Sequence, residues 1–135
     1  MTPSRASPPP SRVAARALLP LLGLSLGLLA ACQRDAAITG TVTYREKIAL
    51  PGDAVVEVTL EDVSHADAAA TVLGRVRLED VGQPPVVFTL PYDPSAIDST
   101  RRYAVRARIT AGKRLLFVTD RRHPVLTGGH GDRVQ

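Results

Sequence analysis

The chain has 135 residues, which suits a single domain, and it contains one Cys and no Trp. Its formal net charge of +4 arises mainly in the first 31 residues, which carry three Arg and no acidic residue. The remainder, from Cys32 onward, is nearly neutral, with 14 Lys and Arg against 13 Asp and Glu. This balance gives no argument for a nucleic-acid partner, which would need a clustered basic face. The single Cys excludes an internal disulfide.

The first 31 residues have the organisation of a secretory signal peptide. Residues 1–16 supply the positive charge, and residues 17–31 are apolar and uncharged. An apolar run of 15 residues extends about 22 Å as a helix, which is short of the ~30 Å hydrocarbon core of a bilayer. The sequence therefore predicts a cleaved signal peptide over 1–31, with an uncleaved membrane anchor as the alternative.

The single Cys stands directly after this apolar run, where Leu29-Ala30-Ala31-Cys32 resembles the lipobox of bacterial lipoproteins. The resemblance implies cleavage between Ala31 and Cys32, a diacylglycerol on the Cys32 sulfur and an acyl chain on the new amine. Several acyl chains anchor a protein stably to a membrane where a single chain would not. We expect Cys32 to be the lipidation site and expect no cofactor besides these covalent lipids. The alternative is a secreted protein with an incidental Cys.

Gln33, the residue after Cys32, bears on the destination of the lipoprotein. In enteric bacteria an Asp at this position tends to retain a lipoprotein in the inner membrane. Gln33 therefore favours the inner leaflet of the outer membrane, with the lipid-anchored domain facing the periplasm.

Past residue 37 apolar and polar residues alternate with a period of two, which is typical of β-strands that bury one face. Gly and Pro clusters separate the alternating runs. We predict an all-β, antiparallel two-sheet β-sandwich of about seven strands over residues 38–127. A lipidated tether (32–37) precedes this domain and a flexible C-terminal tail (128–135) follows it. The predicted strands are 38–45, 56–61, 72–78, 86–90, 103–110, 114–119 and 124–127.

Pro84 and Pro85 come directly before the predicted strand 86–90. Proline has no N–H and cannot donate a hydrogen bond to a neighbouring strand. We therefore expect this strand to start at the prolines or to lie at a sheet edge.

Charged residues occupy the polar faces of three predicted strands. Two Glu of the second strand and two Arg of the third could form ion pairs across a hairpin, each contributing about 0.2–1 kcal/mol. The two Arg of the fifth strand form either a solvated face or a site for an anionic partner. The residues concerned are Glu57, Glu61, Arg75, Arg77, Arg106 and Arg108.

The spacing of the polar residues does not predict a catalytic or metal site. His65 lies near Asp62 and Asp67, and this trio could hold a metal, although solvated loop residues are the simpler interpretation. Asp93 and Asp98 lie in a connecting segment, and an Asp before a Pro usually caps a turn. The serines past Cys32 lie outside any G-x-S-x-G motif, so we expect no catalytic residue, no metal ligand and no enzymatic activity.

Four stretches carry a family resemblance that spans nearly the whole chain after Cys32. They are ITGTVTYREKIALPGDAVVEVTLEDVS (38–64), GQPPVVFTLPYDPSAID (82–98), RRYAVRARIT (101–110) and PVLTGG (124–129). The chain resembles the YbaY family of lipoproteins, which is related to the YscW-type pilotins of type III secretion. The resemblance implies a β-sandwich that faces the periplasm, and pilotins of this type escort an outer-membrane secretin subunit. No functional residue transfers except Cys32.

Two functions follow as hypotheses. The first is a non-enzymatic envelope lipoprotein, a protein-binding accessory or pilotin/chaperone-like factor, because exposed strand edges can accept a partner strand. The alternative is an envelope glycan or small-ligand binding module linked to glycoconjugate metabolism. Scarce aromatic residues argue against it, although a concave patch that exposes Tyr44 or Tyr92 would favour it. A hydrolase would need a cleft that gathers His65 with acidic residues.

Overall fold

The computed structural model describes residues 36–135. The predicted signal peptide and residues 32–35 of the predicted tether, Cys32 included, lie outside the described residues. The described residues form eight β-strands and a short 3-10 helix, which confirms the predicted all-β fold. Within residues 36–135, no helix has the length and hydrophobicity that crossing a membrane requires. The elements are β1 (Ala36–Val42), β2 (Ala54–Asp62), β3 (Thr71–Leu78), β4 (Val86–Tyr92), η1 (Pro94–Ala96), β5 (Tyr103–Ala111), β6 (Arg114–Val118), β7 (His123–Val125) and β8 (Arg133–Val134).

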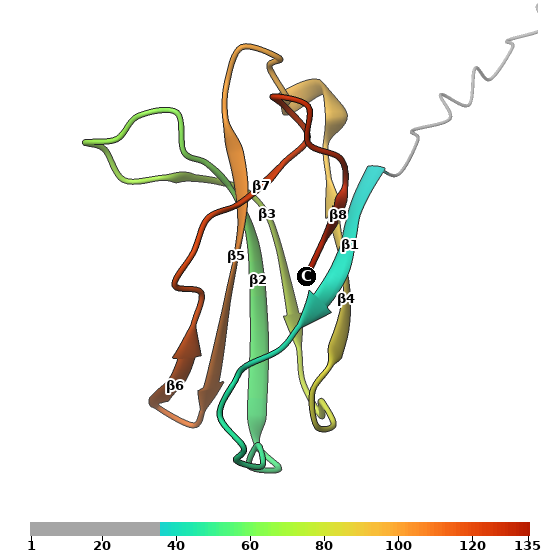
Figure 1. Ribbon diagram of the computed structural model, residues 1–135, viewed down its shortest axis with the longest axis vertical. Coiled ribbons are helices and arrows are strands. Elements are labelled where there is room, and N and C mark those ends of the chain that lie inside the picture. Colours follow the sequence, from blue (N-terminus) through green and yellow to red (C-terminus); the bar gives the residue numbers. More distant parts are fainter. Residues whose placement is uncertain (1–35) are drawn as a thin grey trace, which may run out of the picture. The chain divides into compact units, whose positions relative to one another are not determined.

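The strands form the two sheets of a sandwich (Figure 1). The smaller sheet has the order β4-β1-β8, and the larger sheet has the order β3-β2-β5-β6, with β7 paired to the first part of β5. The pairs are antiparallel except for β1 and β8, which are parallel. The chain passes from one sheet to the other after β1, after β3, after β4 and after β7.

Strands β2 and β5 form the centre of the larger sheet, and each points one row of side chains into the core. On β2 the predicted alternation places Val56, Val58 and Leu60 inward, and all three are fully buried. Burial of such a side chain contributes about 1.5–3 kcal/mol, so this shared core holds the sheets together. The core residues that meet them from the other strands are Ile38, Val86, Phe88, Leu90, Tyr103, Val105, Ile109 and Val125.

Strand β4 begins directly after the cis Pro84-Pro85 peptide and forms an edge of the smaller sheet. This confirms the expectation for the two prolines. A side-chain amide ties the preceding turn to the loop after β1. The Leu50 N–H donates to Gln83 Oε1 (2.9 Å), and Gln83 Nε2 donates to the Leu50 carbonyl (3.2 Å).

The predicted tether is too long by two residues. Ala36 and Ala37 belong to β1, because they pair with Tyr92 and Pro91 of β4. Two small residues carry no clear alternation, so the sequence pattern did not reveal the start of the strand. The domain therefore begins four residues after Cys32.

The segment predicted as a flexible tail (128–135) instead folds back onto the smaller sheet. Gly128 and Gly129 have positive φ angles of 65° and 83°, a conformation that glycine adopts without steric cost. The resulting turn brings β8 beside β1, where the Thr39 N–H donates to the Asp132 carbonyl (2.9 Å). The tail prediction was wrong because a strand of two residues is too short to show alternation.

Truncation of a core side chain should destabilise the domain far more than truncation of an outer one. Leu60 is fully buried, so Leu60→Ala should lower the free energy of unfolding by about 2–5 kcal/mol. Val87 points outward from β4 with 71% of its surface exposed, so Val87→Ala should cost less than about 1 kcal/mol. Urea denaturation followed by circular dichroism measures both values. Equal losses in the two variants would contradict the orientation of these strands.

Candidate functional site

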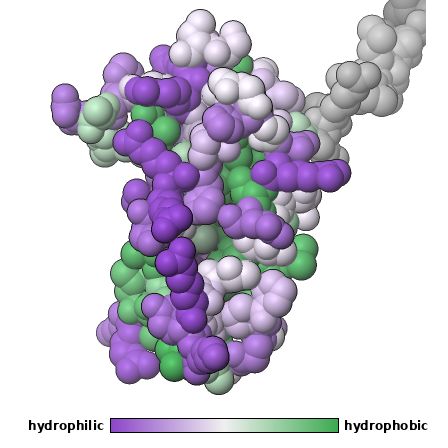
Figure 2. Space-filling model, viewed as in Figure 1, coloured by the Kyte–Doolittle hydropathy of each residue, from purple (hydrophilic) through white to green (hydrophobic). Residues whose placement is uncertain are grey.

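An open cleft lies between the sheets, on the side where β1 and β8 face β5 and β6. Its volume is about 460 Å³. The lining comes from residues 41–46, from the inner face of β5, from residues 117–121 and from Val134 and Gln135. Figure 2 shows hydrophobic residues between hydrophilic ones on the face that carries β1, β6 and β8, so the polar surface does not fully cover the core there.

The floor of this cleft is apolar and belongs to the hydrophobic core. Phe88 of β4 and Val105 and Ile109 of β5 line it, and all three are buried. Ala107 lies between them on β5 and is only partly buried. A floor of this kind fits an apolar group of a binding partner, because it offers hydrophobic contact without a buried charge.

An aromatic pair bridges the two walls. The rings of Tyr44, after β1, and Phe117, on β6, are stacked with centroids 4.2 Å apart and planes 8° from parallel. The Tyr44 hydroxyl donates to the Ile48 carbonyl, which fixes the ring against its own loop. Tyr44 thus lies in a concave surface, but it is half-buried and Phe117 covers one face of its ring, so only part of the ring is open to a sugar. The glycan alternative therefore gains no support from this residue.

Polar groups in the cleft serve mainly to complete the sheet. Thr119 follows β6 and its Oγ1 accepts from the Ala107 N–H (2.7 Å) and donates to the Ala107 carbonyl (2.9 Å). Arg45, Glu46 and Asp120 are exposed where they line the cleft. An apolar floor with charged residues around it is the arrangement found in protein-binding surfaces.

The lining does not assemble a known catalytic group. His123 is its one His, and the lining includes no Ser or Cys among residues 36–135 that could act as its nucleophile. Within those same residues, no group of three or more His, Cys, Asp or Glu is placed to hold a metal ion.

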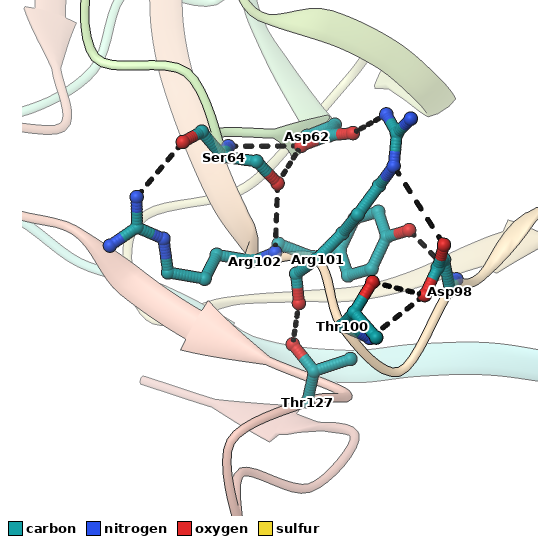
Figure 3. A network of polar contacts seen from close by, with 8 residues as sticks. Asp62, Ser64, Asp98, Thr100, Arg101, Arg102 and Thr127 are labelled. Atoms are coloured by element: carbon teal, nitrogen blue, oxygen red, sulfur yellow. Dashed lines mark hydrogen bonds and ion pairs between the residues drawn. The ribbon is translucent and has the colours of Figure 1, made fainter.

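A polar network lies at the other end of β5, away from the aromatic pair (Figure 3). Asp62 at the end of β2 accepts hydrogen bonds from the Ser64 N–H (2.9 Å) and the Ser64 hydroxyl, and its second oxygen accepts from Arg101 Nη1 (2.8 Å). The Ser64 hydroxyl oxygen also accepts from the Arg102 N–H (3.0 Å). Thr127 donates to the Arg101 carbonyl (2.7 Å). This network joins the end of β2, the start of β5 and the segment after β7.

The network gives Asp62 a structural role, whereas the sequence suggested it as a possible metal ligand together with His65 and Asp67. The hydrogen bond from the Ser64 hydroxyl, followed by that from Arg101, lowers the pKa of Asp62 from 3.8 to about 2. His65 and Asp67 are exposed in the loop beyond it. Asp62 is thus a structural anion, and the structure does not bring the trio together.

The two other acidic candidates cap local turns. Asp93 is the N-cap of η1 and accepts from the Ser95 N–H (2.8 Å) and hydroxyl (2.7 Å). Asp98 accepts from the Thr100 N–H (2.8 Å) and hydroxyl (2.7 Å) in the same way. In both cases the hydrogen bond from the hydroxyl is the main reason that the pKa of the carboxyl is lowered. The expectation that an Asp before a Pro caps a turn is confirmed for Asp93.

The outer face of the larger sheet carries one of the ion pairs that the sequence suggested across the hairpin, between Glu57 and Arg75. Glu61 instead lies near Arg106 of β5 (3.9 Å). Glu57 on β2 is 9% exposed and lies between Arg108 (2.8 Å) and Arg75 (3.6 Å) of the neighbouring strands. Arg77 was expected to pair across the hairpin, but it contacts Glu79 on its own side of the turn (2.9 Å). The central Glu already neutralise part of the Arg row, which weakens the case for an anionic partner there.

Comparison with known proteins identifies the family. The family described as type III secretion system lipoprotein chaperone (YscW) matches residues 33–135. This chain belongs to that family. The YscW-type resemblance expected from the sequence is therefore confirmed, and the match covers both sheets and the cleft between them.

Two relatives agree with this assignment. The protein described as uncharacterized lipoprotein YbaY of Escherichia coli is 41% identical over 93 residues, which are 68% of this chain and 49% of the relative. The chain thus spans about half the length of this curated relative. The solved structure of an alternative pilotin from the type II secretion system of Vibrio cholerae is 44% identical, with a TM-score of 0.71, over 73% of this chain and 90% of that one.

The sequence pointed to some of these residues and missed others. Tyr44 and Tyr92 were noted as the aromatic residues to examine, and of these two Tyr44 lines the concave surface. Phe117 was not singled out within the predicted strand 114–119, although it forms part of the cleft wall. The lipidation site Cys32 and the cleavage site after Ala31 lie outside the described residues and remain predictions.

Asp62 should make the stability of the domain depend on pH. Because folding lowers its pKa from 3.8 to about 2, the ionised carboxylate stabilises the fold above about pH 4. This contribution is lost as the pH falls from about 4 towards 2. Asp62→Asn should lower the free energy of unfolding at pH 7 by about 1–2 kcal/mol, a range that allows for solvent screening at the half-exposed Arg101.

Denaturant unfolding at a series of pH values measures this effect. Asp67→Asn is the matched control, because Asp67 is exposed in the same loop region and should change the free energy little. If the free energy of unfolding depends on pH between about 2 and 4 in Asp62→Asn as it does in the intact chain, the ionised Asp62 carboxylate does not stabilise the fold.

Proposed function

We propose that this chain is a non-enzymatic, lipid-anchored envelope lipoprotein that binds another envelope protein through the cleft between its sheets. The family to which it belongs is described as lipoprotein chaperones. A similar solved structure is a pilotin of a secretion system. By this analogy the partner is an outer-membrane subunit of a secretion machine, and the chain acts as its pilotin-like chaperone in the periplasm.

The open cleft is the observation that carries the proposal. Its floor is apolar, and on one side it reaches Thr41 and Val42 of β1, which lie beyond the two residues that pair with β8. A segment of another protein can use both features, because its side chains bury apolar area and its backbone can hydrogen-bond to the edge. A small soluble substrate would need convergent polar groups, whereas Thr119 in this cleft already bonds to Ala107.

The anchor in this proposal is Cys32, cleaved from Ala31 and modified with a diacylglycerol and an N-acyl chain. Its lipids would hold the protein in the inner leaflet of the outer membrane, as Gln33 favours. Strand β1 starts at Ala36, and four residues of extended chain reach at most about 14 Å. The first end of β1 would therefore stay near the membrane, and the Tyr44 end of the cleft would be directed towards the periplasm.

Cys32→Ser should abolish the lipid anchor. The hydroxyl cannot replace the thiol as the acceptor of the diacylglycerol, so the variant should lose incorporation of labelled palmitate and should leave the membrane fraction. Fractionation of cells expressing the intact chain and the variant measures both effects. A Cys32→Ser protein that is still processed and lipid-labelled would contradict the lipidation of this residue.

Loss of the aromatic wall should weaken binding of the partner. The tagged chain is purified from detergent-solubilised envelopes of its native host, and the co-purified protein is quantified by mass spectrometry. Phe117→Ala removes the stacked ring from the cleft and should reduce the co-purified protein at least about tenfold, as for a hot-spot side chain.

The matched control comes from the same strand. Leu115 of β6 is 58% exposed, and Leu115→Ala should capture as much partner as the intact chain. Circular dichroism confirms that both variants are folded. Capture that is unaffected by Phe117→Ala, or reduced equally by both variants, would contradict the cleft as the binding site.

A further inference from the structure

Strand β8 is only two residues long and extends the smaller sheet on the side of β1 away from β4. It pairs with Thr39 and Gly40, whereas β2 and β5 pair at nine positions. Asp132 and Arg133 are exposed, and Val134 is the half-buried residue of the pairing segment. A strand with so few contacts can separate from the sheet without disturbing the core.

Gly40 allows β8 to approach β1 closely. A Cβ atom at this position would lie 2.2 Å from the Val134 carbonyl oxygen, 2.8 Å from Val134 Cγ2 and 2.9 Å from Phe88 Cζ. A backbone oxygen cannot tolerate a carbon at 2.2 Å, so a larger residue at position 40 would push β8 away. Because Gly40 has no side chain, a small apolar space remains between Gly40 and Phe88, and Val134 fills it. We call this space the Gly40 seat.

The seat of β8 is continuous with the cleft. A second hollow is lined by Thr39, Gly40 and Thr41 on one side and by residues 133–135 on the other. Val134 and Gln135 line the main cleft as well. The two hollows thus share β8 as part of their lining, and removal of β8 would join them along β1.

We infer that the edge of β1 from Thr39 to Val42 is a strand-accepting surface, and that β8 occupies it until a segment of the partner replaces it. The occupant is an extended segment that runs parallel to β1 and places a small apolar side chain over Gly40. Val134 defines this chemistry, because it fills the same seat in the structure. The inference rests on the proposed function, since it specifies how the partner enters the cleft.

Backbone pairing and one side-chain seat supply what such an exchange needs. The Thr39 N–H donates to a carbonyl of the β8 segment, and a partner backbone in the same place can accept that hydrogen bond. Affinity then comes from main-chain hydrogen bonds, and selectivity comes from the size limit that Phe88 and Gly40 impose. A longer segment could continue past Val42 towards Tyr44 and bury apolar side chains on the cleft floor.

The test uses the chain's own segment as the probe. In the full chain held in detergent micelles, deletion of residues 132–135 should remove β8 and leave the edge of β1 without a paired strand. A fluorescent synthetic peptide of residues 128–135, GGHGDRVQ, should bind the shortened chain at least ten times more tightly than the intact chain, whose own β8 competes. A peptide carrying Val134→Asp should bind at least ten times more weakly, because a carboxylate cannot enter the apolar seat.

A glycine variant supplies the matched control. In the shortened chain, Gly40→Ala should weaken binding of the peptide at least tenfold, because the new Cβ fills the seat. Gly82→Ala should leave binding unchanged, since nothing lies within 4 Å of a Cβ at Gly82.

Two results would overturn the inference. The first is a deletion that lowers the melting temperature as far as Leu60→Ala does, because β8 would then be part of the core. The second is a shortened chain that binds the peptide no better than the intact chain. By contrast, a chain that accepts the peptide but captures no envelope protein would overturn the proposed function and leave the strand-accepting edge in place.

Discussion

The smaller sheet has three strands and the larger has five, so one flank of the larger inner face has no strand opposite it. The sheets meet closely where β3 leads into β4, and the buried rows of β2, β4 and β5 hold that side together. On the other side the short β8 is the last strand of the smaller sheet. The cleft follows from this mismatch, because Ala107 and Phe117 of the larger sheet lie partly uncovered there.

Because the two sheets differ in their number of strands, the residues that stabilise the fold and the residues that line the cleft lie in different parts of the domain. Hydrophobic burial along β2 and the polar network around Asp62 support the fold at positions away from the aromatic pair. The cleft can therefore leave Ala107 and Phe117 partly uncovered without depending on a partner for its fold. A lipid on Cys32 would add attachment to the membrane through a short link to β1, so anchor, scaffold and binding surface would occupy successive parts of one small chain.

Period-two alternation predicted seven strands because each of them buries one face, as the row from Val56 to Leu60 illustrates. The sequence could not predict β8, because two residues show no period and their partner Thr39 lies far away along the chain. Nor could it predict the cleft, which depends on the order of strands in each sheet. The alternation placed Arg77 on the correct face of its strand. It did not predict the ion pair with Glu79, because the partner of a long side chain depends on its conformation as well as on the strand register.

We propose that another envelope protein binds at the uncovered flank of the larger sheet. A photocrosslinking amino acid placed at Tyr44, in the cleft, and at Val87, on the outer face of β4, tests this in intact cells of the native host. Irradiation should yield a crosslinked envelope protein from position 44 and none of that product from position 87. The same products from both positions, or none from the cleft, would contradict it.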